Sequence, residues 1–210
     1  MKTVAVIDYG MGNLHSVSKA LTKAGAERVI LTDSADELLA ADRIIFPGVG
    51  ALRDSIDAIK SRGLDEVLRL SIEQKPVMGI CLGMQALFEF SEENGGITGL
   101  GLLKGQVRRF QRKDETAMLK IPHMGWNEVH QREPHPLWEG IEQNSRFYFV
   151  HSYYVDATQT EVVSGETDYG IRFTSAVAQG NLFAVQFHPE KSQVSGLRLL
   201  ANFLQWNGSN

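Results

Sequence analysis

The amino-acid sequence predicts an α/β fold in which a mostly parallel sheet is flanked by helices. Two observations lead to this prediction. In the first half, continuously apolar runs alternate with stretches of helical periodicity, which is typical of a parallel sheet covered on both faces. In the second half, short strand-like segments follow one another between turn signals, which indicates added antiparallel strands.

Three short apolar segments of the first half are expected strands, over 3–8, 43–48 and 76–80. Helical periodicity follows each of them, over 14–24, 52–59 and 84–90, and Gly25 ends the first helical pattern. This order predicts strand–helix units with their strands side by side in one sheet.

The second half contains five strand-like segments and one helical segment. The strands are expected over 106–110, 126–129, 147–154, 161–167 and 181–187, and a helical period over 195–206 would close the fold. We find no internal repeat, low-complexity segment or linker in the sequence. We therefore expect one domain over residues 1–210.

Composition excludes several function classes. One cysteine among 210 residues cannot form an intrachain disulfide, so we expect a reducing, cytoplasmic location. The net charge of −4 gives no general attraction to nucleic acid or acidic membranes, and the N-terminal apolar run reaches Asp8 too early for a signal peptide or membrane span. Basic residues gather only at Arg108, Arg109, Arg112 and Lys113, where we expect a solvated turn.

The single cysteine lies in Gly79-Ile80-Cys81-Leu82-Gly83, between an expected strand and an expected helix. Glycines on both sides of a nucleophile allow a sharp turn that lifts it above the carboxyl ends of the strands. The amino end of the next helix favours a thiolate, and the N–H of Leu82 can point at a developing oxyanion. The alternative is a buried, inert cysteine, which most free cysteines are.

A thiol nucleophile needs a base and a group that orients the base. Of the six histidines, His188 ends the apolar run of AVQFHPE (184–190), so we expect it at a strand end. Glu190 lies two residues further, on the same face of an extended chain about 7 Å away, from where its side chain can bend back to the imidazole. A structural or surface histidine is the alternative, and no metal site is expected because no second ligand stands at metal-binding spacing from His188.

The segment PGVG (47–50) follows the second expected strand. A second oxyanion donor should come from such a neighbouring loop, so the amide of Val49 or Gly50 is a candidate. An ordinary strand-ending turn explains these residues equally well.

Three motifs, GICLGMQ, PGVG and QFHPEKS, together resemble the class I (triad) glutamine amidotransferases. Three further segments, YGMGNLHSV, IPHMGWNEV and FYFVHSYY, resemble the glutaminase subunits of imidazole glycerol phosphate synthases. The resemblance covers nearly the whole chain. It implies a flavodoxin-like class I glutamine amidotransferase fold.

The resemblance also implies a reaction, the hydrolysis of L-glutamine to glutamate and ammonia through a thioester on Cys81. His188 would move the proton and Glu190 would orient His188. Substrate contacts are implied for Gly50, Gln85, Glu93, His151, Ser152 and Tyr153, and no cofactor is implied. On residue type alone, the segment 147–154 would instead be a half-buried strand with an aromatic face.

A partner protein is implied as well, a (β/α)8-barrel cyclase subunit that uses the ammonia to make imidazole glycerol phosphate and an aminoimidazole ribonucleotide (AICAR). The resemblance places the segment PHMGWN at the contact between the two subunits. The implied contact residues are Asn13, Pro122, His123, Met124, Gly125, Trp126, Asn127 and Lys191. On residue type alone, Met124 and Trp126 would be core residues.

Three other interpretations stay open. The chain could be another triad amidotransferase, such as the pyridoxal phosphate synthase glutaminase, although PHMGWN argues against it. It could be a cysteine peptidase or other thiol hydrolase on a related fold. It could also be a binding or scaffold subunit that keeps the fold without the chemistry, although all three triad positions are filled.

Overall fold

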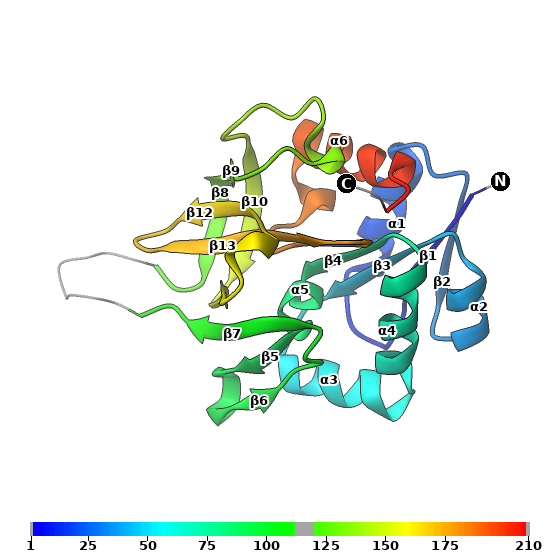
Figure 1. The fold of residues 1–210 in the computed structure, drawn as a ribbon, viewed down its shortest axis with the longest axis horizontal. Helices are drawn as coiled ribbons and strands as arrows, with labels where there is room; N and C mark the ends of the chain where they lie inside the picture. Colours follow the sequence, from blue (N-terminus) through cyan, green and yellow to red (C-terminus); the bar gives the residue numbers. More distant parts are fainter. Residues whose placement is uncertain (1, 112–119, 209–210) are drawn as a thin grey trace.

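A computed structural model describes residues 2–111 and 120–208 (Figure 1). Parallel strands form one half of the central sheet, in the order β2-β1-β3-β4-β14. Their bounds are Arg28–Thr32, Thr3–Ile7, Arg43–Gly48, Val77–Cys81 and Leu182–Val185. Because every one of these strands points the same way, their carboxyl ends meet along one edge of the sheet.

The sheet continues through β13, β11, β7, β5 and β6, where neighbours are antiparallel except for β5 and β7. Their bounds are Arg172–Gln179, Tyr153–Ala157, Leu103–Arg109, Phe88–Ser91 and Ile97–Thr98. On the far side of β13, β12 (Val163–Asp168) also pairs with β9 (His130–Gln131). A separate antiparallel ribbon joins β8 (His123–Glu128) to β10 (Arg146–His151).

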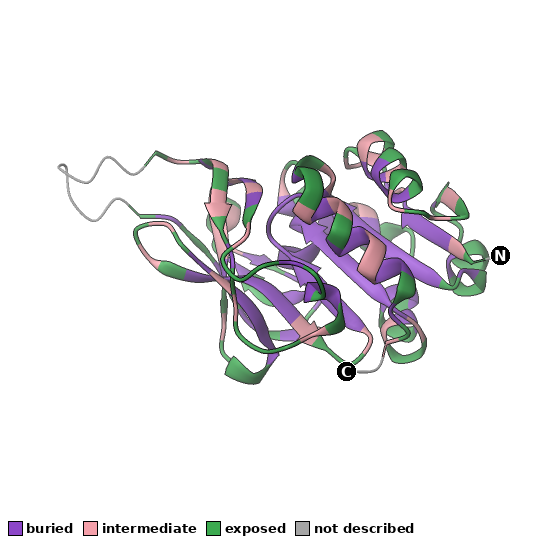
Figure 2. Ribbon diagram, turned by 90° about the horizontal axis from the view of Figure 1, so that it is seen from above, coloured by how far each residue is buried: buried purple, intermediate pink, exposed green. Residues whose placement is uncertain are grey.

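Helices cover both faces of the parallel strands. α1 (Leu14–Lys23) and α6 (Gln193–Gln205) share one core cluster with Val4 and Val6 of β1, whereas α2 (Ala35–Ala40), α3 (Leu52–Ser61) and α4 (Leu64–Gln74) share the other with Ala5 and Ile7. Figure 2 shows the inner parallel strands β1, β3, β4 and β14 buried and the outer helix faces exposed. Burial on both faces explains why these strands are continuously apolar.

The remaining elements are short. α5 (Leu82–Ala86) begins directly after β4, and the described part of the chain also contains four 3₁₀ turns. These turns are η1 (Glu93–Gly95), η2 (Pro136–Trp138), η3 (Thr160–Val162) and η4 (Pro189–Lys191). Two of them, η1 and η4, carry residues that the sequence singled out as site candidates.

The predicted α/β fold with added antiparallel strands is confirmed, but several element predictions are wrong. The helix expected over 84–90 ends at Ala86, and β5 follows because its residues pair with β7. The segment 181–187 forms β14, which pairs antiparallel with β13 as expected but also pairs parallel with β4, so it belongs to the parallel group as well. Strands β2 and β13 and helices α2 and α4 were not predicted.

The expected basic turn is also wrong in its described part. Arg108 and Arg109 end strand β7, and Arg108 forms an ion pair of 2.8 Å with Asp156 on the neighbouring strand β11. Arg112 and Lys113 lie outside the described residues.

Candidate active site

Cys81 lies on a strained bend between β4 and α5. Its φ of 56° and ψ of −110° are unusual for a residue with a side chain. After the bend, α5 packs so closely on β3 that a Cβ on Gly83 would come within 2.0 Å of the carbonyl oxygen of Phe46. On Gly79 a Cβ would come within 2.9 Å of the Ala184 side chain. Both flanking positions therefore require glycine for the steric reason that the sequence pattern suggested.

Strand register places two further segments beside Cys81. Gly48 is the register partner of Cys81, so Val49 and Gly50 leave β3 next to the bend. Val185 is the partner of Ile80, so the chain after β14 emerges on the other side. The carboxyl ends of three adjacent strands thus converge on one sulfur atom.

His188 and Glu190 are joined by a tight turn. Nδ1 of His188 lies 2.8 Å from Oε1 of Glu190, and the two side chains are 3% and 2% exposed. The extended chain expected from the sequence is wrong here, because Pro189–Lys191 forms the 3₁₀ turn η4, which itself brings the carboxylate back to the ring. Backbone contacts fix the turn, because the N–H of His188 donates to the carbonyl of Tyr148 at 2.9 Å.

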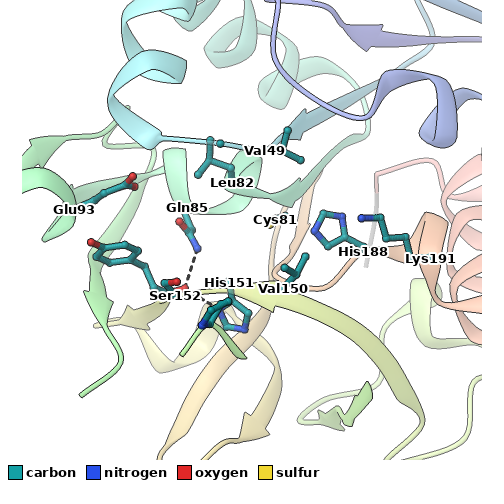
Figure 3. A pocket seen from close by; sticks show the side chains of 13 residues that line it. Val49, Cys81, Leu82, Gln85, Glu93, Val150, His151, Ser152, His188 and Lys191 are labelled. Atoms are coloured by element: carbon teal, nitrogen blue, oxygen red, sulfur yellow. Dashed lines mark hydrogen bonds between the residues drawn. The ribbon is translucent and has the colours of Figure 1, made fainter. Parts of the chain in front are cut away.

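The charge state of His188 follows from its neighbours. Burial lowers its pKa, but the charge and hydrogen bonding of Cys81 and Glu190 outweigh burial and raise the pKa from 6.5 to about 10. The imidazole lies beside Cys81 (Figure 3). Because Glu190 holds Nδ1, Nε2 is the ring atom left for the sulfur. At neutral pH His188 is therefore protonated and can donate from Nε2 toward the sulfur.

A cavity of about 490 Å³ opens at this point. Twelve predicted site and interface residues line it, namely Val49, Gly50, Cys81, Leu82, Gln85, Glu93, Pro122, His151, Ser152, Tyr153, His188 and Lys191. Val150 lines it too and was not predicted. Figure 3 shows that the lining side chains come from both halves of the sheet and from the β8–β10 ribbon. A cavity of this size accommodates a small metabolite such as an amino acid.

Two polar side chains of the cavity are held in place by backbone groups. Glu93 accepts a hydrogen bond from the N–H of Leu52 at 3.2 Å, and burial raises the pKa of its carboxyl group. Nε2 of Gln85 donates to the carbonyl of Tyr153 at 3.0 Å and to Oε1 of Gln186 at 2.8 Å. Gln186 was missed by the sequence analysis, although it stands as a polar residue inside the apolar run AVQF.

His123 and His151 form a buried pair at the wall of the cavity, which His151 lines. Nδ1 of His123 lies 2.9 Å from Nε2 of His151, whose Nδ1 lies 2.8 Å from the carbonyl oxygen of Tyr153. A carbonyl can only accept, so His151 donates from Nδ1 and accepts at Nε2, and His123 donates from Nδ1. Nε2 of His123 then accepts from Asn127 at 3.3 Å. Burial lowers the pKa to about 4 for His123 and to about 3 for His151, so both rings are neutral.

The predicted partner-contact residues divide between surface and interior. Met124 and Trp126 are 61% and 39% exposed, so the expectation from residue type that they belong to the core is wrong. Asn13, Pro122 and Lys191 are exposed, Gly125 and Asn127 are partly buried, and His123 is buried. Glu190 does not line the cavity but supports His188.

No helix within 2–111 and 120–208 is long and apolar enough to cross a membrane. Across the same ranges, no three His, Cys, Asp or Glu side chains are grouped so that they could hold a metal ion.

Comparisons with known proteins agree with this geometry. The family model described as glutamine amidotransferase class-I matches residues 5–206. The chain is 56% identical to the imidazole glycerol phosphate synthase subunit HisH of Nitrosococcus oceani, with 99% of each chain covered. It is 52% identical to the protein of the same name from Acinetobacter baylyi, over 99% of this chain and 100% of that one.

Solved structures share the fold. A glutamine amidotransferase crystal structure superposes with a TM-score of 0.73 at 20% identity, covering 96% of this chain and 97% of the other. The structure of PurLQS from Thermotoga maritima gives 0.72 at 19% identity, over 97% and 98% of the two chains.

Proposed function

The chain belongs to the glutamine amidotransferase class-I family, and we propose that it hydrolyses L-glutamine at Cys81 and delivers the ammonia to a cyclase partner. The observation that carries this proposal is the position of Cys81, which stands on a strained glycine bend beside His188 and at the floor of a cavity. A reducing cytoplasm keeps its sulfur free for the reaction. We assign the whole of residues 1–210 to one amidotransferase domain.

The chemistry has two halves. The Cys81 thiolate attacks the side-chain amide carbon of glutamine, and His188 gives its Nε2 proton to the departing nitrogen, so that ammonia leaves and a thioester remains. His188 then takes a proton from water, whose oxygen attacks the thioester carbon. The carbon–sulfur bond breaks with its electron pair returning to sulfur, and glutamate is released. Glu190 keeps the ring oriented throughout.

The negative oxygen of each tetrahedral intermediate needs two donors. Leu82, the first residue of α5, supplies one N–H, and we assign the other to Val49 or Gly50. Gly50 has a φ of 94°, a conformation that glycine adopts at little cost, so the preceding peptide can rotate. We propose that this rotation completes the site when the partner is bound. A missing donor lowers turnover by about 10²–10³-fold.

The other polar lining residues suit the two ends of glutamine. Glu93 offers a carboxylate to the α-amino group, and the segment from His151 to Tyr153 lies where the α-carboxylate would bind. Gln85, together with Gly50, would hold the body of the substrate. Glu93 therefore gives the cavity a negative charge at the end away from Cys81, where the α-amino group of glutamine would bind (Figure 3).

An exposed apolar surface adjoins the cavity and fits a partner. Met124 and Trp126 of β8 are the register partners of Val150 and Tyr148 of β10, and Lys191 lies 5.8 Å from the Tyr148 ring. Pro122, Val150 and Lys191 line the cavity as well, so a protein seated on this surface would close its mouth.

We propose that the occupant is the (β/α)8-barrel cyclase subunit of imidazole glycerol phosphate synthase, in a heterodimer. Besides Met124, Trp126 and Lys191, the proposed contacts are Asn13, Pro122, His123, Gly125 and Asn127; His123 is buried and would act through its neighbours. Ammonia passed to the cyclase would yield imidazole glycerol phosphate and AICAR in histidine biosynthesis.

The experiment is a glutaminase assay of the purified chain alone, with the cyclase, and with the cyclase and its nucleotide ligand. We expect weak activity alone and strong activity in the last mixture. Full activity of the isolated chain would contradict the proposal that a peptide rotation completes the site when the partner binds. Copurification with a different synthase would identify another triad amidotransferase.

A second assay separates the remaining alternatives. In the presence of glutamine and hydroxylamine, a glutaminase forms γ-glutamyl hydroxamate, and Cys81→Ala should abolish it. Cleavage of a peptide substrate in place of hydroxamate would identify a thiol peptidase. A Cys81→Ser chain that still supported the pathway on glutamine would identify a scaffold subunit.

A further inference from the structure

We propose that Gln186 is a further catalytic residue, whose side-chain amide donates a hydrogen bond to Sγ of Cys81 and stabilises the thiolate. This inference rests on the proposed function, because it concerns the same nucleophile. Nε2 of Gln186 lies 3.6 Å from Sγ, and the residue is 0% exposed. Nothing in the sequence pattern of the triad requires a donor at this position.

Strand register explains why Gln186 reaches the sulfur. Ile80 and Val185 are partners in the parallel ladder between β4 and β14, so the next residue on each strand is Cys81 and Gln186. The backbone N–H of Gln186 donates to the carbonyl of Ser175 on β13 at 2.9 Å. The side chain is therefore fixed at its root by a third strand.

The orientation of the amide follows from its neighbours. The carbonyl of Tyr153 can only accept, so Gln85 must present its NH₂ group there at 3.0 Å. The second hydrogen of that group then donates to Gln186 at 2.8 Å, which requires the oxygen of Gln186 on this side. Its NH₂ group consequently faces Cys81. A reversed Gln186 amide would bring two donors together.

The chemical benefit concerns the charge on sulfur. Hydrogen bonds to an ionised acceptor are stronger than those between neutral groups. The contact therefore stabilises the thiolate before attack and again when the carbon–sulfur bond of the thioester breaks and its electron pair returns to sulfur. An amide has no proton to release at neutral pH, so Gln186 supplies this stabilisation without competing with His188 for proton transfer.

The test measures the thiolate without glutamine, by the pH dependence of iodoacetamide alkylation of the purified full chain. Gln186→Met keeps a similar volume and removes the donor. We expect the midpoint of alkylation to rise by about one pH unit, which is about a tenfold lower rate below the midpoint. With glutamine, the same variant should show a lower kcat and an accumulated thioester by mass spectrometry.

Two controls decide the interpretation. Ser175→Ala removes a buried hydroxyl of β13 that accepts a hydrogen bond from Thr167 on the adjacent strand β12. This variant should leave the alkylation midpoint unchanged. Gln85→Met removes the bond that orients Gln186 and should raise the midpoint by a smaller amount, which tests the idea even if Gln186→Met does not fold. An unchanged midpoint in folded Gln186→Met or in folded Gln85→Met would overturn the proposal. A shifted midpoint in a chain that does not hydrolyse glutamine would overturn the proposed function and leave this inference standing.

Discussion

Two regions of the molecule bury histidines, and the histidine pKa is raised in one region and lowered in the other. At the carboxyl edge of the parallel strands, His188 lies between Cys81 and Glu190, and its pKa rises to about 10. At the wall of the cavity, His123 and His151 contact each other and neutral groups, and their pKa values fall to about 4 and about 3. Burial alone lowers the pKa in all three cases. The presence of negatively charged neighbours is therefore what separates a proton-carrying histidine from a structural one.

The contrast extends to how each region is built. The Cys81 bend depends on backbone sterics, since glycine is required at positions 79 and 83. The ribbon region depends on side-chain hydrogen bonds that run from Asn127 through His123 and His151 to the Tyr153 carbonyl. Changes in the first region should therefore abolish chemistry, whereas changes in the second should alter stability and binding.

The largest effect is expected from Cys81→Ser, which removes the nucleophile and the negative charge beside His188. Glutamine hydrolysis should fall by at least about 10³-fold. The pKa of His188 should move down from about 10, which NMR titration of the imidazole can measure. His15→Gln, a change at an exposed histidine of α1, should leave both quantities unchanged. A His188 titration identical in Cys81→Ser and the parent chain would contradict our account of its charge.

The next effect is expected from Glu190→Gln, which keeps the shape of the orienting side chain but removes its charge. Turnover should fall by about 10³-fold with little change in KM, because the ring loses its orientation and its charge partner. Steady-state kinetics with the cyclase and its ligand can measure both constants. A raised KM with unchanged turnover would instead place Glu190 in substrate binding.

The two regions should also respond to pH with opposite signs. His188 has a folded pKa above its unfolded value of 6.5, so its stabilising contribution is complete below pH 6.5 and is lost as pH rises through about 10. His123 and His151 have lowered folded values, so their contribution is complete above pH 6.5 and is lost as pH falls toward about 4 and 3.

The acid side can be tested with His123→Asn, which keeps a donor toward His151 and removes one titrating ring. Because the folded pKa of His123 is lowered to about 4, unfolding free energy is lost as pH falls from 6.5 toward 4. Urea unfolding at several pH values should show a shallower loss in the variant. A steeper loss than in the parent chain would show that the pair is not held neutral.

The smallest effect on this chain's own chemistry is expected from Trp126→Ala, on the exposed surface of the ribbon. Activity of the isolated chain should stay within about twofold, since Trp126 does not line the cavity. Binding to the cyclase should weaken by about 2–4 kcal/mol if Trp126 is a central contact. Calorimetry with the cyclase measures this loss, and Leu70→Ala, an exposed leucine on α4, serves as the control.

The fold class was predictable from the sequence because the parallel strands carry a clear apolar signal. Elements whose identity depends on distant partners were not. Residues 88–90 have helical periodicity, yet pairing with β7 makes them a strand, and β13 alternates too weakly to be separated from its loops. Tertiary pairing overrides local propensity in such segments.

The site was predictable where a residue type and a turn signal coincide, as at Cys81 and at His188. The approach of Glu190 to the imidazole was expected for the wrong geometric reason, because a 3₁₀ turn cannot be distinguished from a strand end in HPE alone. Gln186 was not predicted because its role depends on register between β4 and β14. The sequence showed only a polar residue within an apolar run, which indicates a buried hydrogen-bond partner but does not identify it.

The carbonyl of Tyr153 limits which histidines of the site can transfer protons. The hydrogen bonds from Asn127 to His123, from His123 to His151 and from His151 to Tyr153 all run toward this carbonyl oxygen. A carbonyl oxygen carries no proton, so it cannot pass one on. His151 borders the cavity, yet both of its nitrogens are already engaged. Of the two imidazoles that line the cavity in the described part of the chain, only His188 can shuttle protons. If His188 is replaced, His151 cannot take over its role in proton transfer.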